Sequence, residues 1–311
     1  MLKNIFTDDA GKRSSPIQKI IYLYPFIIKN EYNMKFNTLA LLALLSLGAV
    51  SCKEKTVSDQ ENSAVTQTKS GNLTTDELKT EINGITHRSY AAYNADLEGP
   101  LPVVFVLPEW WGLNDYVKNR VHQLAELGYY AVGVDYYGDQ KVVDTPEEAK
   151  KLASHFYEIP IDARRMFDAA KHQVSLVDKA DYNKMAIIGY CFGGAQALNM
   201  GRISDDFKGV VSFHGNLSTG IRAKNKSVQY LVLNGAADEM VSQEEIASFK
   251  KEMDSAKIKY TFIDYPDAKH AFTNPKATEI GKKHGLDIAY NKEADEKSWN
   301  EMKKFLEDIF K

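Results

Sequence analysis

From residue 82 onward, short apolar runs alternate with longer segments in which apolar residues recur at helical spacing. Most of the short runs are continuously apolar, which is typical of strands buried on both faces of a parallel sheet. The segment ITHRSYAAYNA is expected to form an opening strand or part of a strand pair. Further strands are predicted within LPVVFVLP, YYAVGVDYYG, MAIIGY, KGVVSFHG, SVQYLVLNG and IKYTFIDYP.

Helices are predicted between these strands, and a final amphipathic helix is predicted from about Asp295 to Lys311. One of them begins at TPEEAKK, where Thr145 is the predicted N-cap and Pro146 the first helical residue. Strands that alternate with helices predict an α/β fold, with a mostly parallel sheet and helices on both faces. In such sheets the active site lies at the carboxyl ends of the strands, so polar residues that end the apolar runs are the candidates for chemistry.

The segment before this domain has the layout of an export signal. Residues 34–51 contain Lys35, a twelve-residue apolar stretch from 39 to 50, and small residues at the end. That stretch is too short to span a bilayer and is typical of a secretory signal peptide. Cys52 follows directly, as in a bacterial lipoprotein signal, where the cysteine is acylated and becomes the first mature residue. An ordinary signal peptide cleaved nearby is the alternative.

The remaining N-terminal residues divide at this signal. Met34 opens a complete export signal, so we expect translation to begin there and residues 1–33 to be a mis-assigned upstream extension. Residues 52–80 are polar and lack aromatic side chains, which predicts a flexible tether. The folded domain is expected at 81–311. Together these features predict an exported protein of the cell envelope, held at the membrane by acyl chains on Cys52.

Composition narrows the function classes. The chain has 311 residues, 44% of them apolar, and a net charge of −3 with acidic and basic residues interspersed. It carries no basic field of the kind that binds nucleic acid. Its two cysteines have no CxxC partner, so neither a zinc site nor a disulfide framework is indicated. We see no metal-ligand constellation and no nucleotide-binding glycine loop, and therefore expect no cofactor.

One of the two cysteines lies where an apolar strand is predicted to turn into a helix. In GYCFGG, residues 189–194, Cys191 stands at the centre of GxCxG, the cysteine form of the nucleophile elbow. The glycines permit a strained turn that projects the central side chain. The helix N-terminus that follows favours a thiolate and a developing oxyanion. The alternative is a buried cysteine that packs as a small hydrophobe.

A nucleophile in this arrangement needs an acid and a histidine later in the chain. Asp238 follows the predicted strand SVQYLVL, and His270 follows IKYTFIDY. His214 also ends a strand and is the rival to His270. The acids that could replace Asp238 are Glu239, Asp264 and Asp267. The histidines expected to be surface or packing residues of helices are His122, His155 and His172.

The segments GYCFGG, NGAADEMV and DAKHAF, together with LPEWWGLNDYVKNRVHQLAELGYYAVGVDYYG, resemble the dienelactone hydrolase family of α/β-hydrolases over about residues 82–311. The resemblance implies an α/β-hydrolase fold, a small-molecule ester or lactone as substrate, and a triad of Cys191, His270 and Asp238. It implies that Glu109 pairs with the resting cysteine and helps to generate the thiolate. It also implies an oxyanion hole formed by the backbone N–H groups of Trp110 and Phe192.

The sequence departs from this family at the residue expected to bind the substrate carboxylate. Asn274 stands four residues after His270, where family members have an arginine, so it is expected to hydrogen-bond substrate without supplying charge. The family's best-known members use a second arginine to bind the same carboxylate, and Arg164 or Arg165 is the candidate for it here. Trp111 is expected in an aromatic pocket wall, with core packing as the alternative.

Two other functions remain open at this point. The same fold could act on another acyl substrate, such as a thioester, an acetylated sugar or an amide. A non-catalytic binding lipoprotein of the envelope is the alternative outside the enzymes, because a fold and a motif do not establish turnover.

Overall fold

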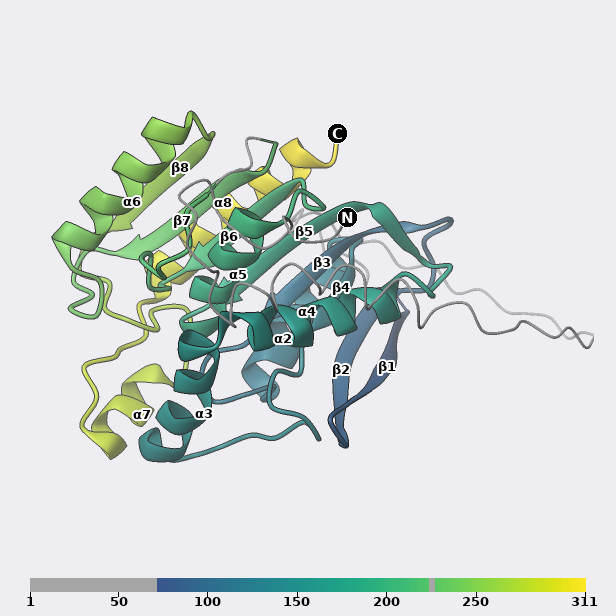
Figure 1. The fold of residues 1–311 in the computed structure, drawn as a ribbon, viewed down its shortest axis with the longest axis horizontal. Helices are drawn as coiled ribbons and strands as arrows, with labels where there is room; N and C mark the ends of the chain where they lie inside the picture. The colour runs from purple at the N-terminus through teal and green to yellow at the C-terminus, as the bar shows by residue number, and fades with distance from the viewer. Residues whose placement is uncertain (1–71, 224–226) are drawn as a thin grey trace, which may run out of the picture. The chain divides into compact units, whose positions relative to one another are not determined.

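The computed structural model describes residues 72–223 and 227–311 (Figure 1). Eight strands form one sheet in the order β1-β2-β4-β3-β5-β6-β7-β8. The strands are β1 (Leu73–Ile82), β2 (Ile85–Asn94), β3 (Leu101–Leu107), β4 (Tyr130–Gly133), β5 (Ala180–Tyr190), β6 (Gly209–Phe213), β7 (Gln229–Gly235) and β8 (Tyr260–Tyr265). Only the β1–β2 and β2–β4 pairs are antiparallel, which confirms the predicted mostly parallel sheet.

The first strand lies partly where the sequence predicts a tether. Residues 73–80, expected to be flexible, belong to β1, which pairs along its whole length with β2. The sequence LTTDELKTEI is polar because β1 is an edge strand, and of its ten side chains only Leu78 is buried. Edge strands tolerate such composition, so the tether boundary at residue 80 was wrong. Residues 1–33, the signal at 34–51 and Cys52 lie outside the described residues.

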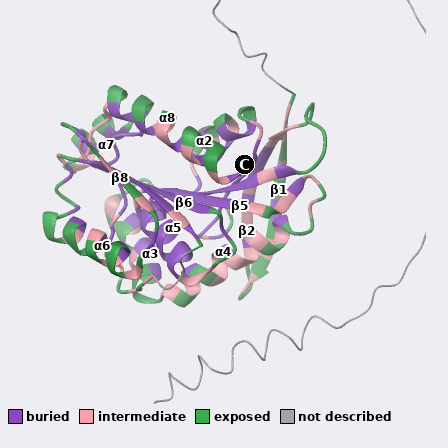
Figure 2. Ribbon diagram, turned by 90° about the horizontal axis from the view of Figure 1, so that it is seen from above, coloured by how far each residue is buried: buried purple, intermediate pink, exposed green. Residues whose placement is uncertain are grey.

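Helices cover both faces of the sheet, as predicted. Figure 2 shows α2 and α8 on one side of the buried strands and α3, α4, α5 and α6 on the other. The helices are α2 (Asp115–Glu126), α3 (Pro146–Glu158), α4 (Pro160–Val174), α5 (Phe192–Ile203), α6 (Gln243–Ala256), α7 (Ala277–His284) and α8 (Lys292–Ile309). No helix within the described residues is both long and apolar enough to cross a membrane.

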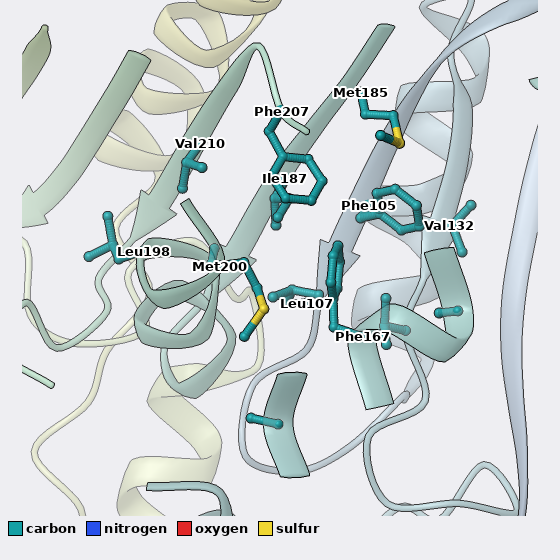
Figure 3. Packing of buried hydrophobic residues seen from close by; sticks show 14 of the residues in the cluster. Phe105, Leu107, Val132, Phe167, Met185, Ile187, Leu198, Met200, Phe207 and Val210 are labelled. Carbon is teal, nitrogen blue, oxygen red and sulfur yellow. The ribbon is translucent and has the colours of Figure 1, made fainter. Parts of the chain in front are cut away.

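Alternate side chains of the central strands fill two separate cores. Phe105 and Ile187 point to the face covered by α4 and α5, where Figure 3 shows them beside Phe167 and Met200. Their chain neighbours, such as Val104, pack on the opposite face against α2 and α8. Because both faces are buried, these strands read as continuous apolar runs in the sequence.

The helix starts follow local capping chemistry. The Thr145 hydroxyl accepts a hydrogen bond from the backbone N–H of Glu148, with Pro146 at the first position of α3, as predicted. The final helix begins at Lys292, three residues earlier than predicted, because the Asn291 side chain caps it. Helix α7 was not predicted, since its eight residues fall in a short polar stretch.

A buried ion pair connects α5 to α6. The Arg202 side chain, at the C-terminal end of α5, donates to Glu252 through Nε (3.1 Å) and Nη2 (2.9 Å). Nη2 also donates to the carbonyl of Leu217 at 2.8 Å. Only 1% of the Arg202 side chain is exposed, so loss of this guanidinium would leave Glu252 without a cation in a largely dry site.

We predict that Arg202→Met lowers the free energy of unfolding by about 3 kcal/mol, because one partner of a buried pair remains uncompensated. Glu252→Gln should also destabilise the fold, because it leaves the more deeply buried Arg202 guanidinium without a carboxylate. Urea denaturation followed by circular dichroism measures both. A loss below about 0.5 kcal/mol for Arg202→Met would show that the pair contributes nothing to folding.

Candidate active site

The turn between β5 and α5 holds Cys191 in a strained backbone conformation. Its φ is 53° and its ψ is −118°, a region that non-glycine residues rarely adopt and that costs roughly 1–3 kcal/mol. The backbone N–H of Cys191 donates to the Phe213 carbonyl (3.0 Å), and the Cys191 carbonyl accepts from Ala195 (3.2 Å). Such strain persists only where the surroundings enforce it, which marks this turn as a functional element.

Glycines make the turn sterically feasible. A Cβ atom on Gly189 would lie 2.1 Å from the Gly193 carbonyl oxygen, and one on Gly193 would lie 2.2 Å from the Leu107 carbonyl oxygen. Any side chain at these two positions would push β5, α5 and β3 apart. The predicted GxCxG interpretation therefore has a direct physical basis: only glycine fits on either side of the cysteine.

His270 and Asp238 form a buried pair next to this turn. Nδ1 of His270 lies 2.9 Å from Oδ2 of Asp238, and the two side chains are 6% and 0% exposed. The loop after β7, which carries Asp238, lies in close contact with the loop after β8, which carries His270. A Cβ atom on Gly235 would lie 2.3 Å from the Ala268 carbonyl oxygen. This hydrogen bond fixes the His270 ring, and its Nε2 atom has no hydrogen-bond partner among the described residues.

The charge state of His270 reflects its neighbours. Burial by itself disfavours the imidazolium, but the electrostatic interaction with the neighbouring Cys191 sulfur and the hydrogen bond to Asp238 outweigh it and raise the pKa of His270 well above the usual histidine value. A histidine that readily takes a proton beside a thiol is the arrangement that produces a thiolate.

The rival histidine, His214, has a different position. Its Nδ1 atom accepts the backbone N–H of Cys191 at 3.1 Å, and its Nε2 atom lies 2.8 Å from the Thr273 hydroxyl. Burial, with the nearby charge of His270, lowers the pKa of His214 well below the usual value, so it is neutral. Its ring packs edge-on against that of His270 at 5.3 Å. His214 thus supports the turn, while His270 has the carboxylate partner.

Glu109 and Asn274 contact each other through a buried hydrogen bond. Asn274 is buried, and its Nδ2 donates to Oε2 of Glu109 at 2.8 Å. Asn274 is not among the residues that line the cavity beside Cys191, and its amide donates to the Glu109 carboxyl group, so its predicted role in binding substrate stays a prediction. Burial raises the pKa of Glu109 to about 7, opposed in part by the Asn274 hydrogen bond and the charge of His270.

A cavity of about 240 Å³ opens beside Cys191. Glu109 and His270 also line it, and its walls are mainly apolar and aromatic, including Trp110, Trp111, Tyr157, Phe192, Met240, Leu286 and Ile288. The backbone N–H groups of Trp110 and Phe192 donate to no other described residue. They are therefore available as the predicted pair of oxyanion donors.

The charged groups near this cavity differ from the prediction. Arg164 and Arg165 pair with Asp168 and Asp162 on α4 and do not line the cavity. Lys150 of α3 is the one lysine or arginine in the lining. Within the described residues, no group of three or more histidine, cysteine, aspartate or glutamate side chains could hold a metal ion.

Sequence reasoning missed a buried polar network behind the His270 loop. The Tyr116 and Thr273 hydroxyls lie 2.6 Å apart, and Arg120 donates to the Thr273 carbonyl at 2.8 Å and also to Asp295. Thr273 therefore links helices α2 and α8 to His214. The sequence holds a weak signal of this network. Arg120 interrupts the apolar face of α2, where its neighbours Val117, Val121 and Leu124 are buried.

Comparison with known proteins agrees with this architecture. The dienelactone hydrolase family model matches residues 88–310. A protein of Methylorubrum extorquens named "Putative carboxymethylenebutenolidase" is 28% identical over 217 residues, which cover 66% of this chain and 74% of that protein. The crystal structure of a dienelactone hydrolase-like promiscuous phosphotriesterase from metagenomic libraries has a TM-score of 0.73 and 29% identity, covering 78% of this chain and 100% of the other.

A more distant structure shares the fold alone. Thermogutta terrifontis esterase 2, phosphorylated by paraoxon, has a TM-score of 0.55 and 14% identity, covering 78% of this chain and 95% of the other. Taken with the family match over most of the chain, these likenesses establish the α/β-hydrolase fold. The chain belongs to the dienelactone hydrolase family and is a hydrolase of the ester and lactone class.

Proposed function

We propose that the protein hydrolyses carboxylic esters or lactones of small molecules through a thioester on Cys191. The observation that carries the proposal is the buried Asp238–His270 hydrogen bond beside a cysteine on a strained turn, with Cys191 and His270 both lining one apolar cavity. A nucleophile, a base and a group that orients the base are the three parts this chemistry requires.

In the acylation step, the Cys191 sulfur attacks the substrate carbonyl carbon after its proton has passed to His270. The carbonyl oxygen becomes an oxyanion, held by the backbone N–H groups of Trp110 and Phe192. Collapse of this intermediate breaks the bond to the alkoxide, which takes a proton from His270 and leaves as the alcohol. The acyl group stays on Cys191 as a thioester.

In the deacylation step, His270 removes a proton from water, and the resulting hydroxide attacks the thioester carbonyl. The thiolate of Cys191 is then expelled, and the acid product leaves. Asp238 keeps the imidazole in one orientation through both steps and stabilises its cationic form.

We assign Glu109 to proton exchange with the resting thiol. It lines the same cavity as Cys191, and its pKa of about 7 lets it gain or lose a proton near neutral pH. Because Asn274 is a neutral amide, it orients the carboxyl group without forcing it to ionise.

Other acyl substrates use the same steps. A thioester, an acetylated sugar or an amide would form the same acyl intermediate on Cys191, and a panel of these compounds distinguishes them by relative kcat/KM. A non-catalytic binding lipoprotein remains the alternative outside the enzymes. Iodoacetamide alkylation of Cys191 at graded pH distinguishes the enzyme from the binding protein, since a thiol that reacts like free cysteine would favour the binding protein.

We also propose export to the cell envelope, with Cys52 acylated after removal of the signal at 34–51 and translation starting at Met34. The order of charge, apolar stretch, small residues and cysteine supports this. Mass spectrometry of the mature N-terminus tests it: acylated Cys52 is expected, and an unmodified cysteine or any peptide from residues 1–33 would contradict it.

For the nucleophile, we predict that Cys191→Ala lowers kcat/KM toward a small activated ester by at least about 1,000-fold, because no thioester can form. Cys52→Ser is the matched control, since it removes the only other cysteine of the chain and should keep full activity. Initial rates with 4-nitrophenyl acetate measure both. Full activity in Cys191→Ala would overturn the mechanism.

For Glu109, we predict that Glu109→Gln makes the protein more stable than wild type as pH rises. The folded carboxyl group keeps its proton up to about pH 7, while the unfolded one loses it near 4.5, so wild type loses stability across that window. The difference between the folded and unfolded pKa values of Glu109 corresponds to about 3 kcal/mol in the free energy of unfolding.

Urea midpoints of both proteins from pH 4 to 8 test this. Glutamine can still accept the Asn274 hydrogen bond, so the two curves should coincide near pH 4 and separate above pH 5. Parallel curves over the whole range would mean that Glu109 titrates normally.

A further inference from the structure

A second cavity lies behind one wall of the catalytic cavity. It has a volume of about 250 Å³ and is lined by Trp111, by Asn114 at the start of α2, by Val143 and Asp144 before α3, and by residues of α7 that include Ile280 and His284. Trp111 is the one described residue that lines both cavities. Its side chain therefore separates two spaces of nearly equal size.

Ring contacts on both sides hold this side chain in place. The indole of Trp111 packs edge-on against Trp110, which lines the catalytic cavity, at 5.1 Å between ring centroids. His284, which lines the second cavity, lies 6.2 Å away. Trp111 is only 6% exposed and packs in a small cluster with Val143 and Ala149. The indole thus fills the gap between the two cavities.

The backbone at Trp111 is fixed as well. Its carbonyl accepts the N–H of Val143 at 3.0 Å, and Gly112 follows with a φ of 90°. A Cβ on Gly112 would lie 2.2 Å from the Lys141 carbonyl oxygen, so the chain after Trp111 has little room to move. The position of the indole is therefore set by the fold rather than by a flexible loop.

We propose that Trp111 is a specificity-determining residue: it restricts the catalytic cavity to a compact group of the ester and shuts off the second cavity. The inference rests on the proposed ester hydrolysis and adds the substrate class. A cavity of 240 Å³ is smaller than the roughly 300–1,000 Å³ of pockets that enclose drug-sized ligands. Joining the two cavities would roughly double the space beside Cys191.

The other half of the ester has a separate exit. Tyr157 and Asn216 line both the catalytic cavity and a wide open hollow that includes Ser218 and Glu244. A long or polar group on this side reaches solvent without meeting Trp111. The size limit therefore applies to one half of the substrate, either the acyl group or the alcohol, and leaves the other half free.

Two series of esters test the proposal on the full chain. One series varies the acyl group from acetyl to decanoyl with a constant 4-nitrophenol, and the other varies the alcohol from methyl to decyl with a constant acetyl group. In Trp111→Ala, the ratio of kcat/KM for the longest over the shortest ester should rise about tenfold or more in one series, since pocket discrimination by size is of this magnitude.

The control is Val143→Ala, which enlarges the second cavity without joining it to the first and should leave both ratios within threefold of wild type. Trp111→Leu repeats the test with an apolar residue if the alanine variant does not fold. Trp111 variants whose ratios stay within threefold of wild type in both series, while ester hydrolysis continues, would overturn the inference.

A readout independent of turnover separates this inference from the proposed function. Cys191 is alkylated with iodoacetamide and with its N-hexyl derivative, and the two second-order rates are compared. Trp111→Ala should raise the relative rate of the bulky reagent about tenfold even if no ester is hydrolysed. Absence of hydrolysis in wild type would overturn the proposed function alone, and an unchanged alkylation ratio would overturn the role of Trp111.

Discussion

The site depends on the close contact between strands β5 and β3 and the first turn of α5. A Cβ atom added to Gly189 or Gly193 would lie 2.1–2.2 Å from a neighbouring carbonyl oxygen, so neither residue could carry a side chain. This contact forces the positive φ of Cys191 and projects its side chain toward the cavity. It also places the N-terminus of α5 beside the cysteine, where unpaired N–H groups can hold an oxyanion. The geometry and the electrostatics at Cys191 therefore have one steric cause.

The loop after β8 connects the remaining parts of the site. His270 contacts Asp238, Thr273 contacts His214, and Asn274 contacts Glu109. Five residues of chain thus link His270 to the neutral His214 beside Cys191 and to Glu109, whose pKa is about 7. A displacement of this loop would change several partners together. The buried network on its far side explains why the loop is held: the chain satisfies polar groups there instead of packing apolar ones.

The parts predictable from sequence were those with a local signature. Buried strands give apolar runs, and glycines stand on either side of Cys191 because no side chain fits at those positions. The parts that could not be predicted depend on distant contacts. β1 is a strand because it pairs with β2 at the edge of the sheet, and its mostly polar sequence carries no local signal of this pairing. Asn274 could be placed four residues after His270, but no local pattern shows that its amide donates to Glu109, 165 positions earlier. The second cavity behind Trp111 is likewise visible only when α7 is in place.

The central claim is that the reaction passes through an acyl group on Cys191. Rapid quenching during turnover of a slowly deacylating activated ester, followed by peptide mass spectrometry, tests it directly. The account predicts that the acyl mass is found on the peptide containing Cys191 and that hydroxylamine removes it, because a thioester is cleaved by this nucleophile. Turnover with no adduct on that peptide, or an adduct on another residue, would contradict it.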